Sequence, residues 1–114
     1  MIWFMKQYVI DELRPEDHEK IKAWFDDNLE HSPVGDLYWL PIDGDFLSEV
    51  QQDHAECAPH VFALELSPGR LSCELLVRTR KRVTCNCIGY ATDRQFLWLV
   101  RRMDTLFEAA GVLS

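Results

Sequence analysis

The chain has 114 residues, of which 47% are hydrophobic and 27% are charged, a balance typical of one globular domain without a disordered tail. It is acidic, with a formal net charge of −7: residues 1–57 carry 14 acidic and 4 basic side chains, and residues 58–114 carry 5 and 8. No apolar run is long enough to span a membrane, and the first residues turn polar too soon for a secretory signal. We therefore expect a single cytoplasmic domain, 1–114, whose four cysteines are free thiols.

The first forty residues are predicted to form a strand, a helix and a short extended segment. Residues 3–10 carry apolar side chains on both faces of a strand, which suits a covered strand or an interface. The helix begins at Pro15 with acidic residues in its first turn and ends near Pro33. Residues 37–41 are apolar and flanked by turn formers, which indicates an edge strand or an ordered connection.

A second helix is predicted over residues 45–57. Asp43 can cap its start, and the apolar spacing places Val50 and His54 on its inward face. Cys57 then lies at the C-terminal end of this helix, close to the start of the next strand.

The strongest local signal is a hairpin over residues 60–77. Pro68 fixes φ and Gly69 accepts a positive φ, as the central residues of a type II turn require. A two-residue loop pairs residues whose side chains share one face: Leu66 with Leu71, Leu64 with Cys73 and Phe62 with Leu75. Turn chemistry and alternation therefore predict the same register.

The last third of the chain is predicted to contain a third strand, 83–91, and the longest helix, 93–110, closed by Gly111. Trp98 points about 160° away from the centre of that helix's apolar stripe, at about 100° per residue. Residues expected on the core side of the third strand are Val83, Cys85 and Cys87. Together the elements predict an α+β fold in two layers, with a mainly antiparallel sheet and about three helices on one face.

Apolar side chains outside these predicted core faces favour an interaction surface. A tryptophan flanked by arginines has the composition of an interface hot spot. We therefore expect a small binding module that self-associates as a homodimer or binds another protein. The sequence disfavours an enzyme. The residues expected at this surface are Trp98, Leu97, Arg101, Arg102, Val61, Leu76, Ile88 and Tyr90.

One run, His54-x2-Cys57-x2-His60, has metal-like spacing, and Cys85 and Cys87 could complete a zinc site. On the predicted elements, however, His60 begins a strand while Cys85 and Cys87 face the core. Packed thiols and no cofactor are therefore favoured, with zinc bound by His54, Cys57 and His60 as the alternative. A thiol reaction at Cys57 with a histidine base is disfavoured, because the C-terminal end of a helix opposes a thiolate.

The predicted tip after the hairpin is strongly basic. It could contact nucleic-acid phosphates, or the acidic half of another copy, through Arg78, Arg80, Lys81 and Arg82. The negative net charge and the absence of an adjacent aromatic residue in the sequence weigh against nucleic acid, which is the second alternative. Glycine-rich phosphate loops and the motifs of serine hydrolases and zinc proteases are absent.

Overall fold

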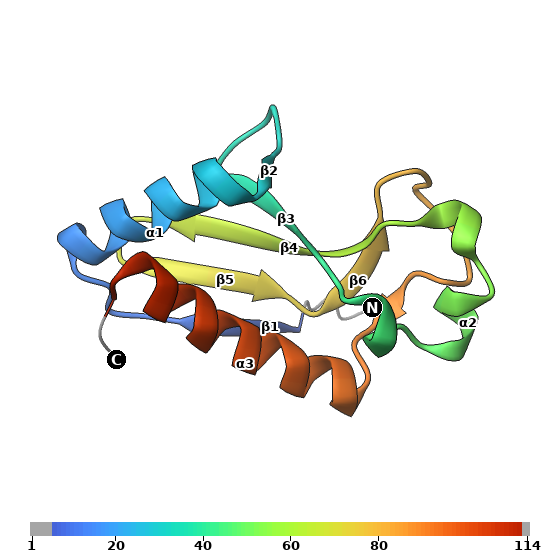
Figure 1. Cartoon of the computed structure of the whole chain (residues 1–114). Coiled ribbons are helices and arrows are strands. Elements are labelled where there is room, and N and C mark those ends of the chain that lie inside the picture. The colour runs from blue at the N-terminus through green and yellow to red at the C-terminus, as the bar shows by residue number, and fades with distance from the viewer. Residues whose placement is uncertain (1–5, 113–114) are drawn as a thin grey trace, which may run out of the picture.

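The computed structural model describes residues 6–112, which form a mainly antiparallel seven-stranded sheet and three α-helices. The two long helices are α1 (Pro15–Asn28) and α3 (Asp93–Ala110), and both lie on the same face of the sheet (Figure 1). This arrangement confirms the predicted α+β fold. No helix among the described residues has the length and apolar character needed to cross a membrane.

The sheet is organised around its longest strand, which covers residues 60–67 and pairs with three other strands. The strands are β1 (Gln7–Ile10), β2 (Glu30–His31), β3 (Leu37–Pro41), β4 (His60–Ser67), β5 (Arg70–Glu74), β6 (Leu76–Thr79) and β7 (Gly89–Tyr90). Their order is β1-β5-β4-β3-β2, with β6 paired to β4 and β7 paired to β6. The predicted first strand is found from residue 7 onward, and its residues 3–5 lie outside the described part of the chain.

The hairpin between β4 and β5 forms in the predicted register near its turn. Gly69 has a φ of +78°, and Leu66 pairs with Leu71. The predicted pairing of Phe62 with Leu75 is wrong, because β5 ends at Glu74 and the Leu75 amide instead donates to the carbonyl of Lys6 at 2.9 Å.

Beyond this break, β6 resumes pairing with β4 in a shifted register. The predicted register sets Val61 opposite Leu76, whereas the structure sets it opposite Arg78, a shift of two residues. A shift by an even number keeps every side chain on its own face of the sheet. Val77 therefore still enters the core, as its exposure of 0% shows.

A single apolar core lies between the sheet and the two long helices. Burying these side chains removes most of their apolar surface from water, which is the main favourable term in folding. The largest buried members are Tyr38, Leu40, Phe62, Leu64 and Leu71 from the strands, Ile21 and Phe25 from α1, and Leu99, Met103 and Leu106 from α3.

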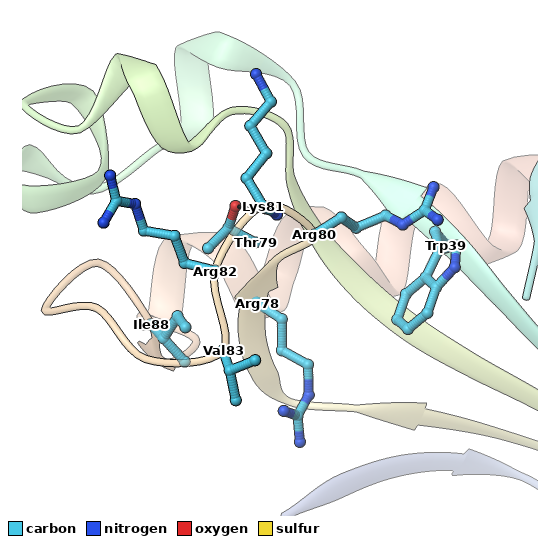
Figure 2. Close-up of a pocket in the computed structure, with 8 residues that line it drawn as sticks. All are labelled: Trp39, Arg78, Thr79, Arg80, Lys81, Arg82, Val83 and Ile88. Carbon is cyan, nitrogen blue, oxygen red and sulfur yellow. Dashed lines mark hydrogen bonds between the residues drawn. The ribbon is translucent and has the colours of Figure 1, made fainter.

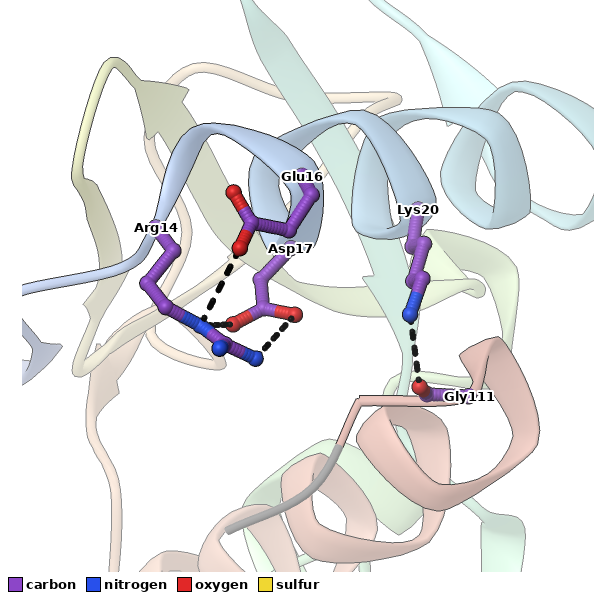
Figure 3. Close-up of polar contacts among 5 residues, drawn as sticks. All are labelled: Arg14, Glu16, Asp17, Lys20 and Gly111. Atoms are coloured by element: carbon purple, nitrogen blue, oxygen red, sulfur yellow. Dashed lines mark hydrogen bonds and ion pairs between the residues drawn. The ribbon is translucent and has the colours of Figure 1, made fainter.

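Polar contacts stabilise the first turn of α1, and one further contact joins α1 to the end of α3 (Figure 3). Arg14 forms an ion pair with the buried carboxylate of Asp17 at 3.0 Å in the first turn of α1, and a longer one with Glu16 at 3.6 Å. One turn further along, the ammonium group of Lys20 donates to the carbonyl oxygen of Gly111 at 3.3 Å. This last bond satisfies a carbonyl that follows α3 and links the two helices across 91 positions of sequence.

The orientation of α3 differs from the prediction, although its bounds are confirmed. Trp98 was expected outside the apolar stripe, but its ring stacks on Phe62 with centroids 6.2 Å apart, and it is half-buried. The reason is that Gln95 is buried together with Leu99, which turns the inward face toward Trp98. Phe96 is left 38% exposed on the other side of the stripe.

The predicted helix over 45–57 is also wrong in extent. The segment is divided into η1 (Gly44–Phe46), α2 (Glu49–Gln52) and η2 (Ala55–Cys57). Ser48 interrupts the helix because its hydroxyl accepts a hydrogen bond from the Gln51 amide at 3.3 Å and so caps a new start. Val50, expected to face inward, is 41% exposed.

Candidate metal centre

Three of the four cysteines converge at one end of the molecule. The sulfur atoms of Cys57, Cys85 and Cys87 all lie within 4.8 Å of one another. Two of these sulfurs, from Cys57 and Cys85, are 3.9 Å apart although the residues are 28 positions apart in sequence. The fourth, Cys73, is a separate core residue on β5 and does not belong to this group, which we call the thiol cluster.

Cys57 is positioned by the last turn of η2. Its amide donates to the carbonyl oxygen of His54 at 2.9 Å, which closes the turn. The carbonyl oxygen of Cys57 then accepts a hydrogen bond from the hydroxyl of Thr79, at the end of β6. The short helical segment is thus fastened to the sheet, and the Cys57 side chain, 1% exposed, is held inside.

The other two thiols come from the loop between β6 and β7, residues 80–88. A turn forms here, since the amide of Ile88 donates to the carbonyl oxygen of Cys85 at 3.0 Å. Behind the loop, the side-chain amide of Gln51 donates to the carbonyl oxygen of Cys87 at 3.3 Å, and that of Gln95 donates to the Gln51 oxygen at 2.8 Å. A buried polar chain therefore connects α3, α2 and the loop.

The thiols of Cys85 and Cys87 differ in acidity. The backbone N–H of Cys87 donates to the Cys85 sulfur and lowers the pKa of the Cys85 thiol, and the Cys87 side chain acts in the same direction. Burial raises the pKa of Cys87 to about 12. Cys85, which is half-buried, is therefore the thiol of this pair that loses its proton first.

The two histidines that the sequence pattern includes have different surroundings. His54 donates from Nδ1 to the carbonyl of Val50 at 2.6 Å, which raises its pKa, and the charge on Cys85 also raises it. His60 is 2% exposed, and neither ring nitrogen has a hydrogen-bond partner among the described residues. Burial lowers the pKa of His60, with a smaller contribution from the charge of His54.

The structure thus brings together a different set of residues from the predicted run. Cys57 meets Cys85 and Cys87, whereas neither His54 nor His60 is a member of the thiol cluster. The predicted third strand over 83–91 is wrong: only β7 is a strand, and Val83 is 93% exposed. Cys85 is half-buried in the loop and not packed on a strand.

The basic residues line a hollow of about 390 Å³, which we call the basic pocket (Figure 2). It adjoins the thiol cluster through the loop 80–88 and includes an aromatic residue that is far away in sequence. Its lining residues are Trp39, Arg78, Thr79, Arg80, Lys81, Arg82, Val83 and Ile88.

The expected interaction surface is only partly exposed. Val61 lies on the sheet face opposite the long helices, as predicted, but is only 1% exposed, and Trp98 is half-buried, so the exposure expected of these two residues is wrong. Leu97 and Tyr90 are 49% and 42% exposed. Arg101 is also exposed, and the half-buried members of the set are Leu76, Ile88 and Arg102.

Comparisons with other proteins do not indicate a function for these features. A comparison with known protein families, with curated proteins and with solved structures finds no match for this sequence. The thiol cluster and the basic pocket are two features of the described residues with the geometry of a binding site.

Proposed function

We propose that this chain is a zinc-binding protein in which Cys57, Cys85 and Cys87 ligate the metal. The supporting observation is the convergence of three sulfurs within 4.8 Å from two segments distant in sequence. In a tetrahedral zinc site with sulfur ligands at about 2.3 Å, neighbouring sulfurs are about 3.8 Å apart. The distance of 3.9 Å between the Cys57 and Cys85 sulfurs matches that edge.

The chemistry of the donors favours zinc over harder cations. Thiolates are soft ligands that select zinc, copper(I) or iron–sulfur clusters, whereas magnesium and calcium require oxygen. Cys57 and Cys87 are each 1% exposed, which is typical of a structural site closed to substrate. Such a metal would fasten the loop 80–88 to η2 and to the start of β4.

We assign His54 as the fourth ligand. Its Nδ1 is engaged by the carbonyl of Val50, and a ring whose one nitrogen donates to a backbone carbonyl is oriented to offer the other nitrogen to a metal. His54 also interacts electrostatically with Cys85. The ring lies outside the 4.8 Å thiol group, so the imidazole and the thiols must draw closer when the metal binds.

Metal stoichiometry tests this assignment. Protein purified from zinc-supplemented medium and measured by elemental analysis should contain one zinc per chain. Cys57→Ser, Cys85→Ser and Cys87→Ser should each lose it, because a hydroxyl is a far weaker zinc ligand than a thiolate. Cobalt substitution then separates the histidines: His54→Gln should change the visible spectrum of the bound cobalt, and His60→Gln should leave it unchanged.

Cys73→Ala is the matched control, since this thiol is buried on β5 and outside the cluster. It should keep one zinc per chain. Wild-type protein without stoichiometric metal would contradict the proposal, and so would loss of zinc in Cys73→Ala to the same degree as in the cluster variants. An unchanged cobalt spectrum in His54→Gln would contradict the assignment of the fourth ligand alone.

Self-association is a second candidate function, favoured by a partly exposed apolar surface on α3. Leu97 is 49% exposed, and a hollow of about 310 Å³ beside it is lined by Phe46, Arg94, Leu97, Trp98 and Arg101. Sedimentation should show a dimer that Leu97→Glu converts to a monomer, because a charge cannot be buried unpaired in such an interface. Val34→Glu, at a site 73% exposed and far away in sequence, should remain dimeric. A monomeric wild type would exclude this candidate.

A further inference from the structure

The basic pocket lies on the face of the sheet that α1 and α3 leave open. Trp39 on β3 faces Ala63 on β4, and Arg78 on β6 faces Val61 on the same side. The loop 80–88 forms the other wall. Figure 2 shows Trp39 and Arg80 on one side of the hollow and Val83 and Ile88 on the other.

The pocket concentrates positive charge on an acidic protein. Four of the 12 basic residues of a chain with net charge −7 occupy positions 78–82 and line this one hollow. Arg78 pairs with Glu74 at 2.8 Å, and Arg80 pairs with Glu30. Lys81 and Arg82 have no ion pair with any residue from 6 to 112. Lys81 and Arg82 are exposed, and Figure 2 shows their side chains extending away from Trp39, so each must swing inward to hold an anion in the hollow.

An apolar and aromatic surface adjoins these cations. The guanidinium of Arg80 lies 5.3 Å from the centre of the Trp39 ring, and Ile88 is half-buried beside the exposed Val83. Planar bases stack on aromatic rings and on arginine guanidinium groups, while ammonium and guanidinium groups bind phosphate. The volume of about 390 Å³ lies within the range of small-molecule sites.

We propose that the basic pocket binds a nucleotide. Lys81 and Arg82 hold its phosphate, and its base packs against the Arg80–Trp39 pair. The nucleotide is either free or one unit of a single-stranded nucleic acid, and the chemistry of recognition is the same in both cases. The net charge of −7 disfavours a long polyanion, since the remainder of the surface repels it.

The pocket shares its loop with the proposed metal centre. Thr79 donates to the carbonyl of Cys57, and its oxygen accepts from the amide of Lys81 at 3.2 Å, so the start of the loop is fixed without any metal. The nucleotide proposal therefore stands apart from the zinc proposal. A chain that binds nucleotide but no zinc would contradict only the metal centre.

Calorimetric titration of the purified full chain tests the pocket with AMP, UMP, ribose 5-phosphate, inorganic phosphate and a short single-stranded oligouridylate. AMP should bind more tightly than ribose 5-phosphate, because only AMP carries a base. Replacing Lys81 and Arg82 together by alanine should weaken AMP binding by roughly tenfold to a hundredfold, as loss of charge-assisted hydrogen bonds does.

The matched control replaces Arg70 on β5 and Arg102 on α3 by alanine, which removes the same charge outside the pocket. This variant should bind AMP as the wild type does and retain the same circular dichroism spectrum. Tighter binding of the oligouridylate than of UMP would support the strand as the natural source of the nucleotide. Equal affinity for AMP and ribose 5-phosphate, equal weakening in both double variants, or no binding of any probe to the wild type would each overturn the proposal.

Discussion

Removal of the metal by a strong chelator is expected to lower the melting temperature of the protein by roughly 10–20 °C. A ligand that binds only the folded chain stabilises it by about 2.7 kcal/mol when its free concentration is a hundred times its dissociation constant. The thiol cluster exists only in the folded chain, because Cys57 and Cys85 are 28 positions apart. The apolar core should keep the metal-free protein folded at room temperature.

Thermal denaturation followed by circular dichroism, with and without chelator, measures this effect. Cys57→Ser is the internal control, since a chain that holds no zinc should melt at the same temperature in both conditions. Readdition of zinc should restore the wild-type transition only. A chelator effect of equal size in the Cys57→Ser variant would show that the metal acts elsewhere and would contradict the proposed centre.

Trp98→Ala is expected to destabilise the protein by roughly 2–3 kcal/mol, less than the loss of a fully buried aromatic residue, because Trp98 is half-buried against the core. The Trp98 ring packs against Phe62 and Phe46, with centroids 6.2 Å away in each case, so its removal opens a cavity between α3 and the sheet. Part of this cost comes from losing ring–ring contacts that aromatic pairs make beyond area burial.

Urea denaturation gives the free energy of unfolding for this comparison. Leu97→Ala, one residue earlier on α3 and 49% exposed, should change that free energy by no more than about 0.5 kcal/mol. Similar losses in the two variants would indicate that Trp98 does not have the core position described above. The pair therefore separates a core role of Trp98 from the surface role that the sequence pattern suggested.

The parts of the fold that short-range chemistry determines were predictable. Gly69 accepts the positive φ of the turn, and Gly111 ends α3, as local rules require. The orientation of α3 was not predictable from its hydrophobic stripe, because Gln95 is buried for hydrogen bonding to the carbonyl of Phe46 and to Gln51. A polar residue in the core rotates the inward face, and apolar periodicity does not record it.

The candidate site was only half predictable for a similar reason. The run containing His54 and Cys57 had metal-like spacing, but the remaining thiols were assigned to a strand because they alternate. Cys85 and Cys87 instead flank Asn86 in a loop, and the polar residues Thr84 and Asn86 beside Cys85 were the signal that the sequence offered. The basic pocket required tertiary structure altogether, since Trp39 reaches Arg80 from another strand.

The thiol cluster also has a mechanical consequence. Positions 57 and 87 are 30 residues apart, and the chain between them contains β4, β5 and β6. With a metal bound, that stretch becomes a closed ring, so a force that pulls the two termini apart would bypass it. About 100 Å of extensible chain would stay hidden from the applied load until a zinc–sulfur bond ruptures.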